Sequence, residues 1–234
     1  MRMGYPLEAV FSQEANITSV AIGRKAHQLV VLGGEDNNVT LWKIGAPKPF
    51  VLLGHQTPMD SVRFNPLEQY VFGGSRGGAM KIWDVETTKP IRTETCHRGC
   101  VRTIDYHPFP SGDCWITGSD DTTVKVWDFR HRGAVQVYKG HLAPVSVVRF
   151  SPDGNWMVSG DRAGVAKIWE LTTGKPVCEL RTQKKEEITS MMFHPSEFLL
   201  AIACGTPGNR RVDFWDVDAF KQVSFTTSEA NIIR

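Results

Sequence analysis

Three histidines and two cysteines are the residues of this chain whose types and spacing come nearest to a site of chemistry. His55, His97 and His141 recur at intervals of 42 and 44 residues, and Cys96 and Cys100 flank the second of them. Imidazole and thiolate groups are common zinc ligands, so a metal site is the first hypothesis to weigh. Two thiolates and one imidazole leave the fourth ligand unsupplied, and no Ser–His–Asp or Cys–His pair has a catalytic spacing. The even spacing instead indicates a structural repeat.

A set of tryptophans follows the same period. Each ends a short run of β-forming residues such as "VKVW", and successive members lie 41, 44, 42 and 46 residues apart: Trp42, Trp83, Trp127, Trp169 and Trp215. Turn signals such as "RFNP", "RFSPDG" and "FHPS" recur at matching places. Two series with one period indicate internal repeats.

Each repeat predicts four strands. In the fourth repeat the runs "VSVVRF", "NWMVSG", "VAKIW" and "PVCEL" are rich in β-branched and aromatic residues, and Pro152-Asp153-Gly154 supplies a turn. Four strands in about 42 residues, with Gly-His and Trp-Asp landmarks, are typical of a WD-repeat β-propeller. The sequence therefore predicts an all-β fold with five complete four-stranded blades, at about 12–53, 54–95, 96–138, 139–181 and 182–227.

The two ends of the chain predict parts of further blades. Residues 5–11, "YPLEAVF", resemble the last strand of a closing blade. Residues 228–234, "SEANIIR", resemble the opening "QEANITS" of the first blade and predict the start of another. Because the strands that would complete these parts are absent, we expect an incomplete, open ring. Open edges and faces would make such a fragment prone to aggregate.

The WD resemblance assigns the histidines a structural role. In WD repeats the histidine hydrogen-bonds a Ser or Thr of the second strand and an Asp of the next turn, beside the tryptophan. His97, Thr117, Asp121 and Trp127 form a full set, which predicts that blade 3 is the most rigid and blade 5 the least. The other blades depart from the set: Ala163 beside His141 and Ser159, Gly73 and Gly77 beside His55, Gln13 beside Asp36, and Lys184 with Asn209.

One face of the predicted propeller is the expected docking surface. Residues on either side of the first apolar residue of each inner strand project onto this face in propellers, where loops carry function. These predicted contacts are Asn16, Thr18, Pro58, Asp60, Cys100, Arg102, Pro144, Ser146, Glu187 and Thr189, with Arg76 and Arg162 added from neighbouring loops. Arg130 and Arg132, in the loop "RHR", are candidates for contact with an acidic partner.

Composition narrows the class of function. The 234 residues are 41% hydrophobic and 22% charged, with a net charge of +2, which gives no indication of nucleic-acid or membrane binding. Five cysteines without a CxxC pair fit a reducing, intracellular compartment. We expect no cofactor, no bound metal and no enzymatic activity, because the repeat explains the polar clusters.

Longer phrases carry a more specific resemblance. "WDFRHRGAVQVYKGH", "RFSPDGNWMVSG" and "FHPSEFLLA" leading to "FWDVDAFKQVS" are similar to the WD-repeat domain of katanin's regulatory, non-catalytic subunit. The resemblance covers nearly the whole chain, although blade 5 lacks the Gly-His pair and its "TPGNR" loop looks inserted. It implies a cytoplasmic targeting domain that directs a microtubule-severing ATPase to microtubules, centrosomes or spindle poles. Its implied partners are tubulin, centrosomal or spindle-pole proteins, and the catalytic ATPase through a C-terminal region that has no counterpart here.

Two alternatives stay open. Trp127-Asp128-x-Arg130 resembles the docking box of substrate receptors for cullin–RING ubiquitin ligases, although this box is short. The other alternative is a different WD-repeat adaptor. An enzyme would require a polar cluster that the repeat period does not explain.

Overall fold

The computed structural model describes residues 15–23, 28–109, 113–182, 185–206 and 209–228, and every regular element in these ranges is a β-strand. The strands form five separate antiparallel sheets of four strands, each in simple chain order. Within the described ranges, the structure contains no helix of the length and apolarity that a membrane span needs. We call the sheets blades 1 to 5 in chain order.

The strand bounds follow the repeat. Blade 1 contains β1 (Ile17–Ile22), β2 (Leu29–Gly34), β3 (Val39–Lys43) and β4 (Phe50–Leu52). Blade 2 contains β5 (Met59–Phe64), β6 (Tyr70–Ser75), β7 (Ala79–Asp84) and β8 (Pro90–Thr95). Blade 3 contains β9 (Val101–Tyr106), β10 (Cys114–Ser119), β11 (Val124–Asp128) and β12 (Ala134–Tyr138). Blade 4 contains β13 (Val145–Phe150), β14 (Trp156–Asp161), β15 (Val165–Glu170) and β16 (Pro176–Arg181). Blade 5 contains β17 (Ile188–Phe193), β18 (Leu199–Thr206), β19 (Asn209–Asp216) and β20 (Lys221–Ser228).

Turn chemistry ends the strands where the sequence indicates. Between β13 and β14, Gly154 has a φ of 74°, in the left-handed region that favours glycine. The carboxylate of Asp153 accepts hydrogen bonds from Ser151 and Asn155, which fixes this turn. A side chain at position 154 would collide with His107, whose ring contacts this turn from blade 3. The turn therefore also determines how closely blades 3 and 4 approach.

Apolar faces hold neighbouring blades together. The inner strands β1, β5, β9, β13 and β17 contact one another in succession, and each pair of neighbouring blades shares a buried cluster. Between blades 2 and 3, for example, Phe72 and Ile82 pack on Ile104 and Trp115. Hydrogen bonds also cross these faces, such as the one that the amide of Phe150 donates to the carboxylate of Asp105.

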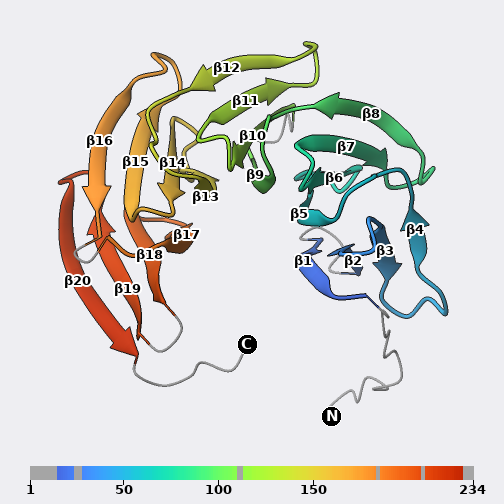
Figure 1. Ribbon diagram of the computed structural model, residues 1–234, viewed down its shortest axis with the longest axis horizontal. Coiled ribbons are helices and arrows are strands. Elements are labelled where there is room, and N and C mark those ends of the chain that lie inside the picture. Colours follow the sequence, from blue (N-terminus) through green and yellow to red (C-terminus); the bar gives the residue numbers. More distant parts are fainter. Residues whose placement is uncertain (1–14, 24–27, 110–112, 183–184, 207–208, 229–234) are drawn as a thin grey trace.

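The blades form an arc that is open between β1 and blade 5 (Figure 1). The prediction of an all-β propeller with five four-stranded blades in an open arrangement is confirmed. The partial blade predicted at 5–11 lies outside the described residues, as do residues 229–234 of the one predicted at 228–234. Ser228, predicted to begin a further blade, is instead the last residue of β20 and pairs with Arg210.

A core substitution tests the packing between blades. Ile104 is fully buried between blades 2 and 3. We expect Ile104→Ala to lower the free energy of unfolding by about 2–4 kcal/mol, because the cavity between the blades cannot collapse. Ile91→Ala, at a half-exposed position of β8, is the matched control and should cost under about 0.5 kcal/mol. Urea unfolding measures both, and equal effects would contradict the packing.

Candidate protein-interaction surface

A buried polar network ties together the strands of blade 3. His97 Nδ1 lies 2.9 Å from Asp121 Oδ2, and His97 Nε2 lies 2.7 Å from Thr117 Oγ1. Trp127 Nε1 donates to the same hydroxyl at 2.9 Å. Because the ionised carboxylate can only accept, His97 donates from Nδ1, and the Thr117 hydroxyl donates to Nε2. The network thus joins the loop after β8, strand β10, the β10–β11 turn and strand β11.

Burial favours a neutral histidine, and the network favours an ionised aspartate. Burial lowers the pKa of His97 to about 4, and the charge of Lys125 adds to this effect. Burial alone would raise the pKa of Asp121, but the hydrogen bond from Thr123 and the proximity of His97 bring that pKa to about 2. These groups are therefore structural at neutral pH, with no group set near pH 7 for general acid–base catalysis.

Blade 4 carries a complete network that the sequence analysis missed. His141 Nδ1 lies 2.7 Å from Asp161 Oδ2, His141 Nε2 lies 2.6 Å from Ser159, and Trp169 donates to Ser159 at 2.7 Å. The expected place for the carboxylate was position 163, where Ala163 stands. The interpretation of blade 4 as degraded is wrong, because Asp161 at the end of β14 reaches the same imidazole and also accepts from the Ala163 amide.

Blades 1 and 2 use other contacts. His55 packs against Trp83, with ring centroids 5.4 Å apart, and Trp83 donates to the carbonyl of Leu53. A side chain in place of Gly73 would collide with Met59 and with Trp83, so these two side chains fill the space beside the glycine. In blade 1, Trp42 donates to the carbonyl of Ala46.

The remaining residues that were predicted to join such networks make other contacts or lie outside the described residues. Trp215 packs at the edge of the cluster shared by blades 4 and 5. Asp36 accepts hydrogen bonds from Asn38 within its own turn. Gln13 and Lys184 lie outside the described residues, and Asn209 begins β19.

The histidine and cysteine side chains singled out in the sequence do not come together around a common metal site. His97 contacts Asp121, whereas the Cys100 thiol donates to Asp60 at 3.1 Å. Burial, and then the hydrogen bond to Asp60, raise the pKa of Cys100 to about 12, so the thiol stays protonated. Burial likewise raises the pKa of Cys96 to about 12. No group of three or more His, Cys, Asp or Glu residues suited to a metal ion occurs among the residues that the structure describes.

Charged side chains instead form a continuous row at one end of the blades. We call this row the charged arc; from blade 1 to blade 5 its members are Glu35, Arg76, Asp60, Arg102, Asp120, Arg162 and Glu187. Acid and base alternate, and every neighbour pair is an ion pair. The contacts run from 2.5 Å, between Arg102 and Asp60, to 3.9 Å, between Arg162 and Asp120. Ion pairs therefore connect all five blades at this end.

The antiparallel order of the strands explains why these residues meet. Asp60 and Arg102 lie near the starts of inner strands β5 and β9, and Arg76 and Asp120 follow second strands β6 and β10. The starts of inner strands and the ends of second strands lie at the same end of an antiparallel sheet. The structure thus brings together five predicted contacts, Asp60, Arg76, Arg102, Arg162 and Glu187.

Two members of the charged arc were missed from the sequence. Glu35 and Asp120 each occupy the turn after a second strand, in "GGED" and "GSDD". An acidic residue at the same place in both turns was the available signal. Asn16, a predicted contact, donates to Glu35 at 2.9 Å and extends the row.

Asp60 lies at the centre of the arc and is mostly buried. Burial raises the pKa of this carboxyl, but hydrogen bonds from Arg76 and Cys100 and the charge of Arg102 outweigh it, so the net pKa is lowered. The hydrogen bonds to Asp120 raise the pKa of Arg102 above its already high ordinary value. Arg76, Arg162 and the terminal acids are more exposed. The arc therefore has a fixed centre and accessible flanks.

Thr18 and Ser146, two other predicted contacts, bind the backbone. The Thr18 hydroxyl contacts the carbonyls of Gly33, at 3.0 Å, and of Met59 in the next blade, at 2.5 Å. Ser146 does the same with Gly160 and with Ile188 of blade 5. Their hydroxyls therefore connect neighbouring blades, a structural role that the sequence analysis did not assign.

Arg130 and Arg132 lie apart from the charged arc. They occupy the β11–β12 connection, which is at the opposite end of blade 3 from the β10–β11 turn. Arg130 is exposed and forms an ion pair with Asp128 at 2.5 Å. Arg92 of blade 2 donates to the carbonyls of Phe129 and His131 and so fixes this loop. The chain thus presents two separate charged surfaces.

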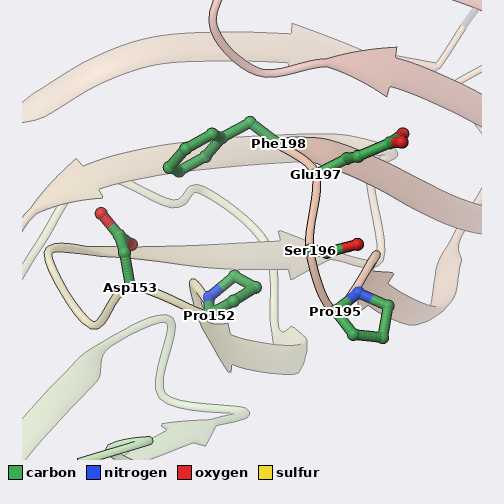
Figure 2. Close-up of a pocket in the computed structure, with 6 residues that line it drawn as sticks. All are labelled: Pro152, Asp153, Pro195, Ser196, Glu197 and Phe198. Atoms are coloured by element: carbon green, nitrogen blue, oxygen red, sulfur yellow. The ribbon is translucent and has the colours of Figure 1, made fainter.

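A pocket of about 230 Å³ lies between blades 4 and 5, at the same end as the turn that contains Gly154. Figure 2 shows the two turns that line it, Pro152–Asp153 and Pro195–Phe198, with the carboxylate of Glu197 directed away from Asp153. The Ser196 hydroxyl lies 3.4 Å from the ring of the nearby His194, in an exposed turn. Diverging carboxylates and a long local Ser–His contact do not make a catalytic site.

Family comparison agrees with this geometry. Residues 48–84, 88–128 and 133–170 match the model of the WD domain, G-beta repeat. These segments are WD repeats, and the chain carries a WD-repeat domain. Propellers of this class are typically non-catalytic scaffolds for protein interaction.

The chain is similar to proteins from several organisms. The chain is 33% identical over 150 residues to nuclear distribution protein PAC1 of Gibberella zeae, covering 60% of this chain and 32% of PAC1. It is 27% identical over 191 residues to transcription initiation factor TFIID subunit 5 of Caenorhabditis elegans, covering 82% of this chain and 29% of that subunit. It is 24% identical over 212 residues to the human angio-associated migratory cell protein, covering 72% of this chain and 48% of that protein. The first two alignments span about a third of each relative's length.

Because these histidines are buried, we expect the folded chain to lose stability in acid. Burial brings the pKa of His55 and of His97 to about 4, whereas an unfolded histidine has a pKa of about 6.5. Between these values the unfolded chain binds more protons, so the free energy of unfolding falls as pH falls from 6.5 to 4, by about 1–3 kcal/mol per histidine. Urea unfolding across this range measures the slope.

A matched variant shows how much of this pH dependence comes from His55. His55→Phe keeps a ring beside Trp83 and removes one titrating group. We expect its stability to depend less steeply on pH than that of the parent chain. A parent chain with the same stability at pH 7 and pH 4.5 would contradict the assignment.

Proposed function

We propose that this chain is a non-catalytic protein-interaction scaffold that docks a folded partner on the charged arc. The observation that carries the proposal is the row of ion pairs across five blades, with a buried Asp60 at its centre and accessible Arg76, Arg162 and Glu187. A partner with alternating charges could replace flank contacts of this row without unfolding any blade. Such complementarity favours specificity and association rate.

The more specific proposal is a targeting domain of the katanin regulatory type. It is supported by the phrases "WDFRHRGAVQVYKGH" and "FWDVDAFKQVS", which lie in blades 3 to 5. In this proposal the domain works in the cytoplasm and directs a microtubule-severing ATPase to microtubules, centrosomes or spindle poles. The partner surfaces are then tubulin and centrosomal or spindle-pole proteins.

The loop with Arg130 and Arg132 is the surface proposed to contact acidic tubulin tails. Both side chains are exposed, and Arg92 fixes the backbone of the loop. Two exposed guanidinium groups on a fixed backbone suit carboxylates of an extended acidic segment. The charged arc, with four acids and three arginines, suits such a segment less well.

Microtubule co-sedimentation tests this proposal. We expect the chain to pellet with microtubules at low salt, and the double variant Arg130→Ala, Arg132→Ala to lose about tenfold in affinity. Arg181→Ala, at an exposed arginine of β16, is the control and should bind normally. Binding should weaken as salt rises. No pelleting of the parent chain at low salt would contradict direct microtubule binding.

The same loop favours a second candidate function. Arg130 forms an ion pair with Asp128 while its guanidinium stays exposed, as a cullin-adaptor docking box of the form Trp-Asp-x-Arg would require. Under this hypothesis a purified cullin adaptor captures the parent chain and not Arg130→Ala. Equal capture of both proteins would count against a docking role for Arg130.

A further inference from the structure

The pocket between blades 4 and 5 is built from two turns that each carry a proline and an acid. Pro152 and Asp153 come from the β13–β14 turn, and Pro195 and Glu197 come from the β17–β18 turn. Phe198, at the end of the second turn, completes the lining. Both turns follow an inner strand, so the pocket lies at the end of the blades opposite the charged arc. It is therefore a site separate from the arc.

Aromatic rings lie in and beside this pocket. Phe198 is 41% exposed, and in Figure 2 its ring extends toward the turn that carries Asp153. The Phe198 carbonyl accepts a hydrogen bond from the Val217 amide, which brings the β19–β20 turn beside it. In that turn Phe220 packs on Trp156 of blade 4, with ring centroids 6.2 Å apart. The pocket thus combines an exposed aromatic ring with a carboxylate.

The Asp153 carboxylate keeps its charge and one further acceptor position. Its Oδ1 accepts from the Ser151 hydroxyl at 2.5 Å and from the Asn155 amide at 3.3 Å, and its Oδ2 accepts from the Asn155 side chain at 2.7 Å. Burial raises the pKa of Asp153, but these hydrogen bonds outweigh it, so the net pKa is lowered. Because the two oxygens of a carboxylate offer about four acceptor positions, Oδ2 retains the capacity to accept another donor.

Charge and size at this end of blades 4 and 5 favour a single basic side chain. The turns at 151–155, 170–175, 194–198 and 216–221 contain five Asp or Glu residues and two Lys residues, an excess of three negative charges in a chain whose net charge is +2. The pocket volume of about 230 Å³ lies below the range of about 300–1,000 Å³ that is usual for a free small-molecule ligand. Charge complementarity therefore points to one cationic side chain of a larger partner.

We propose that this pocket binds an exposed arginine side chain of a partner protein. The guanidinium stacks on the Phe198 ring and donates to Asp153 Oδ2. The aliphatic stem lies against Pro152 and Pro195. Arginine makes both contacts at once because its guanidinium is planar and carries donors along its edge, whereas lysine is a point charge. The partner segment is thus basic, unlike the acidic segment suited to the Arg130 loop, and the proposal depends neither on that loop nor on the charged arc.

A titration with a capped arginine tests the proposal. N-acetyl-arginine amide is added to the isotope-labelled full chain, and the backbone amide shifts are followed by NMR. We expect shifts at Gly154, Ser196 and Phe198 with a dissociation constant of about 1–10 mM, and none at Asp60 or Arg76 in the charged arc. The citrulline analogue, which is neutral and has nearly the same shape, should not bind. The lysine analogue should bind about threefold more weakly or worse.

Matched variants separate the pocket from general attraction to negative charge. Asp153→Asn keeps an oxygen that accepts the hydrogen bonds of the turn but removes the charge, and should weaken arginine binding about threefold. Glu197→Gln removes an equal charge that points away from Asp153 (Figure 2), and should weaken binding by less than about 1.5-fold. Phe198→Leu keeps an apolar side chain without the ring and should cost about threefold.

The amide spectrum of each variant also reports its fold, and Phe198→Leu, at an exposed position, decides the question if Asp153→Asn does not fold. No shift of the pocket amides at about 20 mM arginine would overturn the proposal. Equal losses in Asp153→Asn and Glu197→Gln would also overturn it, because they would show attraction to the acidic surface as a whole. Unchanged binding by Phe198→Leu, or equal binding of the lysine analogue, would do the same by removing the role of the planar guanidinium.

Discussion

Each blade is a four-stranded sheet with apolar side chains on both faces, and this constraint governs the rest of the structure. A face is buried only when another blade lies against it, as Val62 shows against blade 1 and Val20 shows by contrast. Packing of successive faces aligns the inner strands. That alignment brings the turns after the second strands to one end, where Glu35 and Asp120 meet arginines from neighbouring blades. The charged arc is thus a consequence of apolar packing.

The histidine networks of blades 3 and 4 satisfy their own polar groups. In blades 3 and 4 a histidine, a hydroxyl, a carboxylate and an indole form closed sets, because an unpaired polar group in such a place is costly. In blade 2 the hydroxyl is replaced by Gly73, and the side chains of Met59 and Trp83 fill the space beside the glycine. This variation changes how each blade is held without changing its strands. His97 and His141 are each bound within their own blade, so among the described residues they form no common site.

The repeat period predicted the fold well, because each landmark repeats with the strands. Position within a turn was harder to predict, since Asp161 reaches His141 from two residues before the expected Ala163. Thr18 and Ser146 were placed on the correct strands, but their backbone contacts depend on the approach of the next blade. Glu35 and Asp120 share one place in their turns, but their pairing with arginines depends on the three-dimensional packing that brings those partners beside them.

The central claim is that a blade face is protected only by a neighbouring blade, and thiol labelling tests it most directly. Val20→Cys and Val62→Cys place a cysteine at the same repeat position in blades 1 and 2, and peptide mass spectrometry distinguishes them from the native cysteines. The account predicts rapid maleimide modification of Val20→Cys in the folded chain, whereas Val62→Cys reacts only on unfolding. Equal protection of the two cysteines would contradict it.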